Sequence, residues 1–107
     1  MNTEPSAGDV WFADLGMAAK SRPVLVLAYP ERDDARALVI VAPLTSQIRG
    51  MRGEVEIGNH RWLTKRSAVN IQGLASFDRH ALSRRLGRLD AHTMEKIKTA
   101  LRDLLGL

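Results

Sequence analysis

The sequence of 107 residues contains no cysteine, which excludes disulfide bonds, thiolate nucleophiles and cysteine-ligated zinc. Aromatic residues make up only 5% of the chain, so a core must be built mainly from valine, leucine, isoleucine and alanine. No apolar run approaches the roughly 20 residues that cross a bilayer, and the N-terminus lacks the basic and apolar regions of a signal peptide. We therefore expect a cytoplasmic protein with no membrane partner.

Acidic residues are scarce in the middle of the chain. Residues 49–88 hold nine basic and three acidic side chains, whereas the segments on either side carry no basic excess. Most of the nine are arginines, whose guanidinium groups bind phosphates in a fixed fork and stack on bases. This distribution favours a polyanion partner such as nucleic acid, although a merely solvated basic surface would have the same composition.

The length and the 45% share of hydrophobic residues predict one packed domain, residues 8–107, after a short frayed tail, residues 1–7. Alternating or continuous apolar runs and turn residues predict five strands. These strands cover residues 9–15, 22–29, 36–45, 54–58 and 67–77. Gly73 should interrupt the last of them with a bulge or a bend.

The C-terminal third is expected to contain helices. Asp78 can cap a short helix over RHALSRR, followed by a brief strand over residues 85–90. The clearest helix follows Asp90, has an apolar stripe from Met94 to Leu105 and ends at Gly106. The whole pattern predicts a mainly β fold of the α+β class, a small antiparallel barrel or curved sheet with a C-terminal helix packed on it.

The chain has few groups suited to metal or nucleophilic chemistry. His60, His80 and His92 lie in three separate segments without the spacing of metal ligands, so surface positions explain them best. No acidic cluster resembles a two-metal site, and no phosphate-binding loop, nucleophile elbow or dinucleotide-binding motif is present. We therefore expect neither a metal nor another cofactor.

Two strand ends carry the remaining candidates for chemistry. Arg22 begins the second predicted strand and Thr45 ends the third, so an antiparallel pairing would place both side chains at one rim of the barrel. A guanidinium and a hydroxyl at one spot can hold a phosphodiester and stabilise the charge that develops during its cleavage. The alternative is structural, with Arg22 paired to an acid such as Asp14 and Thr45 capping a turn.

Five stretches resemble, in order, the MazF/PemK toxins of bacterial type II toxin–antitoxin systems. They are GDVWFADLG, SRPVLVL, VIVAPLTSQ, GEVEIG and LGRLDAHTMEKIKTALRDLLGL, and together they extend from about residue 8 to residue 107. The resemblance implies an SH3-like barrel of the CcdB/MazF type, usually a homodimer. It also implies a metal-independent endoribonuclease that cuts single-stranded mRNA at short sequences, and a cognate antitoxin that blocks the RNA groove with an acidic segment.

The resemblance implies Arg22 and Thr45 as catalytic residues, with Arg22 stabilising charge and donating a proton to the 5′-oxygen. The sequence departs from the family pattern at two places. The loop GMAAKS before Arg22 is short, and Lys20 is expected to take over a phosphate contact there. Many relatives have an acidic residue and an arginine where this chain has Gln72 and Ala75, so a carboxylate general base is missing from that position.

Further residues are expected to bind RNA because they are basic, neutral and polar, or aromatic. They are Lys20, Ser46, Gln47, Arg49, Arg52, Asn70, Gln72 and Trp11. Burial in the core is an equally good explanation for Trp11, and an interface is as good an explanation for Trp62 as base stacking. Two rival functions remain at this point: a non-enzymatic toxin of the same fold that inhibits DNA gyrase, and a barrel that binds RNA without cutting it.

Overall fold

The computed structural model of the chain describes residues 4–14, 21–31 and 37–107. Its strands and turns follow the chain as β1 (Asp9–Ala13), β2 (Arg22–Ala28), β3 (Leu38–Thr45), β4 (Glu54–Gly58), β5 (Ser67–Asn70), the 3₁₀ turn η1 (Ile71–Gly73), β6 (Ala75–Asp78), the 3₁₀ turn η2 (Arg79–Ala81) and β7 (Leu82–Arg88). Helix α1 (Ala91–Leu105) ends the chain. No helix in the described part of the chain is long and apolar enough to cross a membrane.

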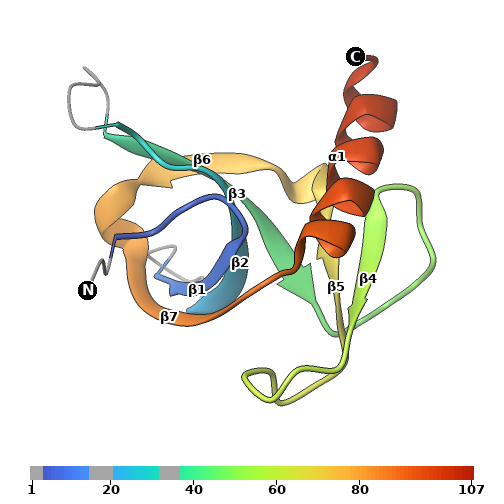
Figure 1. Cartoon of the computed structure of the whole chain (residues 1–107), viewed down its shortest axis with the longest axis horizontal. Helices are drawn as coiled ribbons and strands as arrows, with labels where there is room; N and C mark the ends of the chain where they lie inside the picture. The colour runs from blue at the N-terminus through green and yellow to red at the C-terminus, as the bar shows by residue number, and fades with distance from the viewer. Residues whose placement is uncertain (1–3, 15–20, 32–36) are drawn as a thin grey trace.

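The seven strands form one antiparallel sheet with β3 near its centre. The strand order is β4-β5-β3-β2-β1-β7, and β6 pairs with the first half of β3. The last two residues of β3, Leu44 and Thr45, pair with β5, so this long strand belongs to both halves of the sheet. Figure 1 shows the sheet curling round on itself at the left, with α1 standing beside β4 and β5 at the right. Within the described residues the sheet does not close, which makes it an open, barrel-like version of the predicted architecture.

Two apolar clusters lie on opposite faces of the central strands. Inside the curl, buried valines of β2 and β3 pack with Ala13, Trp11 and Phe77. On the other face, Leu25 and Leu44 pack against Ile97, the buried residue of α1, and against β4 and β5. Because the strands are covered on both sides, the apolar run of β2 is continuous rather than alternating.

The predicted C-terminal helix is confirmed. The Asp90 side chain accepts a hydrogen bond from the Thr93 backbone N–H at 2.7 Å, and Gly106 takes the left-handed conformation at the C-cap with φ of 72°. The interruption at Gly73 is also present, as the turn η1 between β5 and β6.

The short helix predicted over RHALSRR is wrong beyond its first turn. Asp78 does cap a turn, because its side chain accepts a hydrogen bond from the His80 backbone N–H at 2.8 Å. The turn stops at Ala81, and the chain continues as β7, which pairs with β1 along its length. The ladder to β1 outweighs the local helix propensity of the serine and arginine residues, which periodicity alone does not reveal.

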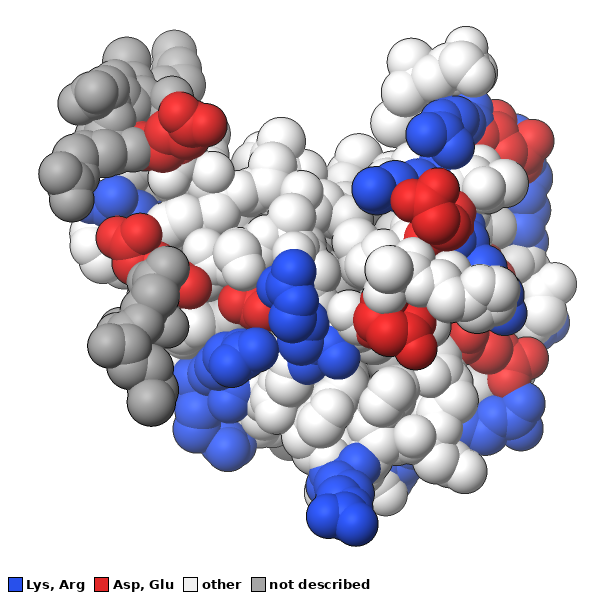
Figure 2. Space-filling model, viewed as in Figure 1, with Lys and Arg blue, Asp and Glu red and all other residues white. Residues whose placement is uncertain are grey.

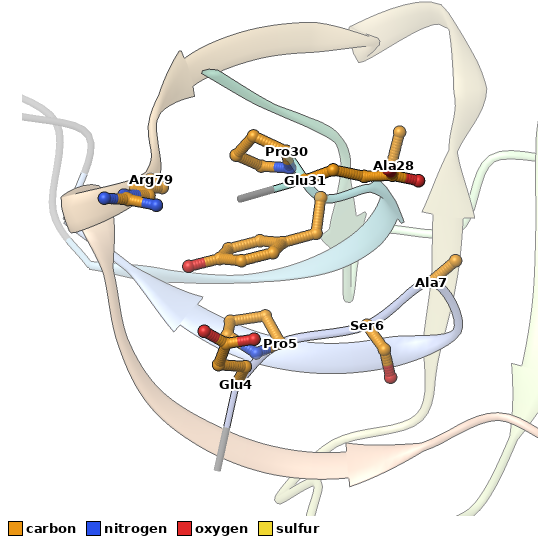
Figure 3. Close-up of a pocket in the computed structure, with 9 residues that line it drawn as sticks. Glu4, Pro5, Ser6, Ala7, Ala28, Pro30, Glu31 and Arg79 are labelled. Carbon is orange, nitrogen blue, oxygen red and sulfur yellow. The ribbon is translucent and has the colours of Figure 1, made fainter. Parts of the chain in front are cut away.

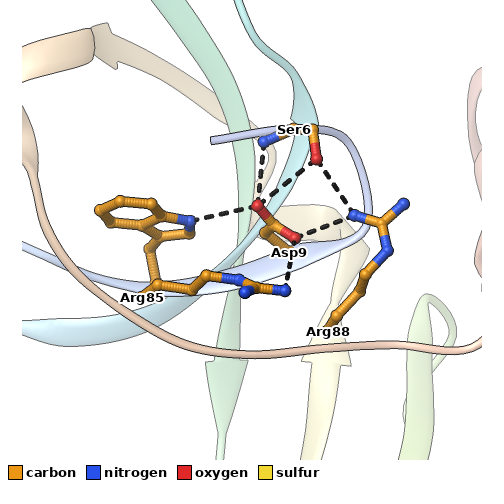
Figure 4. Close-up of polar contacts among 5 residues, drawn as sticks. Ser6, Asp9, Arg85 and Arg88 are labelled. Carbon is orange, nitrogen blue, oxygen red and sulfur yellow. Dashed lines mark hydrogen bonds and ion pairs between the residues drawn. The ribbon is translucent and has the colours of Figure 1, made fainter. Parts of the chain in front are cut away.

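A buried carboxylate fastens the start of β1 to β7. The Asp9 side chain is only 4% exposed and accepts hydrogen bonds from the Ser6 backbone N–H at 3.0 Å and from Arg88 at 2.9 Å, while Arg85 lies 3.5 Å away (Figure 4). The Trp11 indole N–H donates to the same carboxylate at 3.5 Å. Residues 1–3 of the expected tail lie outside the described residues, whereas Ser6 is held by these contacts.

Candidate active site

Arg22 and Thr45 lie at the same rim of the sheet because of the register between β2 and β3. Val24 faces Pro43 across the two strands, and continuing this antiparallel register by two residues sets Arg22 opposite Thr45. Both side chains line one concavity of about 470 Å³. The other lining residues are Pro23, Leu44, Ser46, Gln47, Leu63, Thr64, Lys65 and Ser67. The structure therefore brings together the two residues that were singled out as strand ends.

The lining of this concavity, called here the Arg22 pocket, suits an anion. It contains two cationic side chains and four hydroxyl groups but no carboxylate. Arg22 is exposed, and no acid forms an ion pair with it among the residues that the structure describes. The proposed structural pairing of Arg22 with Asp14 is therefore not part of this arrangement. An exposed guanidinium without an acidic partner is available to a phosphate.

The Thr45 hydroxyl accepts a hydrogen bond within the fold and can still donate one to a substrate. Its Oγ1 accepts a hydrogen bond from the Gln47 backbone N–H at 3.1 Å, which caps the turn after β3. A hydroxyl that accepts still has its own O–H to donate. The turn-capping alternative and the catalytic role are thus compatible, and the cap fixes the position of the hydroxyl.

A second concavity of about 170 Å³ adjoins the Arg22 pocket and shares Thr45 and Gln47 with it. The remaining lining residues of this second concavity are Arg49, Met51, Arg52, Glu54, Asn70 and Gln72. The two concavities together form a groove, called here the rim groove, which contains most of the residues predicted to bind RNA.

Several polar side chains of the rim groove are hydrogen-bonded to one another. Arg49 donates to Gln47 Oε1 at 3.3 Å, and the Gln72 side-chain amide donates to the Arg52 carbonyl at 2.9 Å. Asn70 Oδ1 accepts from the Gln72 backbone N–H at 3.2 Å. These bonds hold the loop between β3 and β4 against η1. The amide side chains that are expected to bind RNA therefore also shape the groove.

The arginines of this loop differ in how they are held. Arg52 donates to the Asp103 carbonyl oxygen at 3.2 Å and forms an ion pair of 3.4 Å with its carboxylate, which ties the loop to α1. Among the described residues, the Arg49 guanidinium has only the weaker bond to Gln47. Both guanidinium groups are exposed, so neither contact prevents binding of a phosphate.

Several lining residues of the rim groove, among them Thr64, Lys65 and Glu54, do not follow from the sequence. Thr64 and Lys65 come from the loop between β4 and β5, and their presence depends on how that loop folds back over β7. Glu54, the first residue of β4, also lines the groove. Its Oε1 accepts hydrogen bonds from the backbone N–H groups of Arg49 and Met51, at 2.9 and 3.3 Å.

Trp11 is the predicted RNA contact that the structure does not bring to the groove. It is half-buried in the inner apolar cluster and lines a different concavity with Tyr29, Arg79 and His80. That concavity continues into a larger one of about 750 Å³, whose lining includes Pro5, Pro30 and, at one side, Arg79 (Figure 3). Lys20 lies outside the described residues.

Charge on the surface is uneven. Figure 2 shows Lys and Arg side chains gathered in the lower left of one face, while acidic and basic side chains alternate along the right side, where α1 stands. Strand β7 contains three arginines, Arg84, Arg85 and Arg88. In the described part of the chain, no three His, Asp or Glu residues lie close enough to hold a metal ion.

Known proteins resemble this chain over nearly its whole length. Residues 6–105 match the family of PemK-like, MazF-like toxins of type II toxin–antitoxin systems. The chain is 37% identical to the probable endoribonuclease MazF5 of Mycobacterium tuberculosis, over 94% of this chain and 93% of that protein, and 32% identical to the endoribonuclease EndoA of Bacillus subtilis, over 94% and 93%. A mycobacterial endoribonuclease solved with its cognate antitoxin superposes with a TM-score of 0.81 at 31% identity, covering 97% of each chain. The chain therefore belongs to the PemK/MazF family of toxins of type II toxin–antitoxin systems.

Proposed function

We propose that this protein is the toxin of a type II toxin–antitoxin system and acts as a metal-independent endoribonuclease on single-stranded RNA, with mRNA as the expected substrate. The observation that carries the proposal is the meeting of Arg22 and Thr45 in one pocket that has no carboxylate in its lining. Its named endoribonuclease relatives, alike over nearly their whole length, support the same activity. The RNA strand follows the rim groove past Arg49 and Asn70.

The RNA supplies its own nucleophile, so the main task of the site is to stabilise the negative charge that develops at the phosphate. The 2′-oxygen of the RNA attacks the adjacent phosphorus, the bond from phosphorus to the 5′-oxygen breaks, and the products are a 2′,3′-cyclic phosphate and a 5′-hydroxyl. Solvent water takes the proton of the 2′-hydroxyl, and the departing 5′-oxygen takes a proton from Arg22, which solvent then restores. Arg22 donates to the nonbridging oxygens, and the Thr45 hydroxyl adds one further donor where negative charge grows.

We further propose that the protein acts in the cytoplasm as a homodimer and is inhibited by a cognate antitoxin. A relative has been solved with its antitoxin, and the basic groove is complementary to an acidic antitoxin segment. Leu38 and Ile40 of β3 are 42% and 41% exposed, which is apolar surface that a second copy would cover. Sedimentation equilibrium of the purified protein tests the dimer directly.

The decisive experiment incubates the purified protein with a long labelled RNA in the presence of EDTA and maps the 5′ ends of the products. We expect cleavage at a short recurring sequence, with 5′-hydroxyl ends. Arg22→Ala and Thr45→Val should each slow cleavage by at least about 100-fold, because each removes one donor to the transition state. Thr45→Ser is the matched control, since it keeps a hydroxyl that can both cap the turn and donate.

Other outcomes would point to the rival functions. Intact RNA together with inhibited DNA gyrase indicates the non-enzymatic toxin, and RNA retained in a gel shift without product indicates a barrel that only binds. Full cleavage by both the Arg22→Ala and the Thr45→Val proteins would contradict the assignment of these residues. Equal unfolding midpoints of the variants and the wild type show that a loss of activity is not a loss of fold.

A further inference from the structure

The loop between β4 and β5 brings a second cation to the Arg22 pocket. We propose that Lys65 is a further catalytic residue, whose ammonium group contacts a nonbridging oxygen of the phosphate that is being cleaved. This inference rests on the proposed ribonuclease function and adds a residue to that site. Lys65 lines the same concavity as Arg22 and Thr45, and these two cations face no carboxylate in its lining.

The Lys65 side chain is free to bind an anion. No hydrogen bond or ion pair involves its ammonium group among the residues that the structure describes. The adjacent Arg66 differs, because its guanidinium forms an ion pair with Glu56 and it does not line the pocket. Of two neighbouring cations, one is therefore engaged on the surface and the other is available to a phosphate.

The backbone that carries Lys65 is braced on both sides. The Ser67 hydroxyl donates to the Lys65 carbonyl at 3.0 Å, and Ser67 is itself buried. Earlier in the loop, the Leu63 backbone N–H donates to the His60 carbonyl at 3.1 Å, and His60 Nε2 donates to the Ile57 carbonyl at 2.8 Å. The loop is thus fixed by hydrogen bonds at its start and its end.

An aromatic contact holds the middle of the loop against β7. The Trp62 ring stacks on His60 with centroids 4.5 Å apart and lies directly over Gly87. A Cβ atom at Gly87 would come within 2.3 Å of the indole, so only glycine allows this approach. Trp62 therefore packs as an anchor. A cation on an anchored loop needs little rearrangement when charge develops on the phosphate.

The first test compares Lys65→Met with Arg66→Met, which remove the same charge from neighbouring positions. Single-turnover cleavage of an RNA that carries the mapped sequence should slow by about 10- to 100-fold for Lys65→Met. Arg66→Met should stay within about twofold of the wild type, because an exposed ion pair contributes little. Lys65→Arg keeps the positive charge and should retain most of the rate. Equal rates for Lys65→Met and Arg66→Met would overturn the inference.

The second test locates the contact on the RNA. An RNA with a 2′-deoxy group at the attacking position cannot be cleaved, so its affinity can be measured for the wild type and for Lys65→Met. We expect Lys65→Met to weaken binding of this RNA, and the difference to disappear when the phosphate at the cleavage position is replaced by a neutral methylphosphonate. A difference that persists would place the Lys65 contact elsewhere and contradict the proposal.

The proposed ribonuclease function and the proposed role of Lys65 are refuted by different results. If the wild type cleaves RNA but Lys65→Met cleaves it equally fast, only the role of Lys65 is refuted. If the wild type cleaves no RNA, the ribonuclease function fails and the role of Lys65 fails with it. Matching unfolding midpoints for Lys65→Met and Arg66→Met confirm that both variants keep the fold.

Discussion

Single polar groups in this protein combine a structural contact with a chemical role. The Thr45 hydroxyl caps the turn after β3 through the Gln47 N–H and keeps its own proton for a substrate. The side-chain amide of Gln72 binds the Arg52 carbonyl and still lines the groove. Such double use fixes the positions of the groups before RNA arrives, which reduces the cost of ordering them in the complex.

Asp9 makes the stability of the fold depend on pH. Burial of its carboxylate is the largest single influence and raises its pKa. The hydrogen bonds from the Ser6 N–H, Arg88 and Trp11, with the charge of Arg85, together outweigh burial, so the pKa lies below its ordinary value. A lowered pKa means that Asp9 stabilises the fold above the usual aspartate range, about pH 4, and that this contribution is lost as the pH falls through the lowered value.

Replacing Asp9 by asparagine should therefore destabilise the protein only where the carboxylate is ionised. At pH 7 the free energy of unfolding should fall by about 2 kcal/mol, because two arginines lose a buried anionic partner. At pH 3 the difference from the wild type should be smaller. Urea unfolding at both pH values measures this, and Glu95→Gln, at an exposed carboxylate that among the described residues pairs only with Lys98, is the control. An equal loss at the two pH values would exclude the ionic explanation.

At the scale of elements, the loop between β3 and β4 depends on Glu54. One oxygen of this carboxylate holds the backbone N–H groups of Arg49 and Met51, and the Glu54 N–H donates in turn to the Met51 carbonyl at 3.0 Å. The loop is therefore closed at the first residue of β4. Since Arg49 and Arg52 lie on it, its shape sets where two cations of the rim groove stand.

Glutamine at position 54 should be tolerated, whereas alanine should not. Glu54→Gln keeps an oxygen that accepts both N–H bonds, so cleavage should stay close to the wild-type rate. Glu54→Ala leaves the two N–H groups to water, and KM should rise by about tenfold with a smaller change in kcat. Steady-state cleavage of a short RNA measures both constants. If Glu54→Gln is as inactive as Glu54→Ala, Glu54 acts instead as a base in the reaction.

The sequence predicts the elements well where a local pattern decides them. The strand positions, the C-terminal helix with its cap at Asp90, and the break at Gly73 all depend on periodicity or on a single residue type. The extent of β7 does not follow from a local pattern, because its pairing with β1 overrides a local helix signal. Likewise, Arg22 and Thr45 follow from strand register, whereas Lys65 reaches the same pocket through the packing of Trp62 on Gly87, a contact between distant segments.

At the scale of the whole molecule, the residues that stabilise the curled sheet are different from those that line the rim groove. The two apolar clusters lie on the faces of the central strands, and the rim groove lies at one end of β2 and β3. Residues of the groove are mostly exposed or half-buried, so they can be exchanged without opening the core. This separation is what makes the matched variants of the groove informative about function rather than folding.

The excess of positive charge predicts how RNA binding responds to salt. If Arg22, Arg49, Arg52 and Lys65 each neutralise a phosphate, the logarithm of the association constant should fall with the logarithm of the salt concentration, with a slope of about −0.7 for each contact. Fluorescence anisotropy with an uncleavable single-stranded RNA at a series of salt concentrations measures the slope. Lys65→Met should make it less steep by about one contact, whereas Arg66→Met should change it little, because Arg66 already pairs with Glu56. An affinity that does not change with salt would mean that the cations of the rim groove do not follow the RNA backbone.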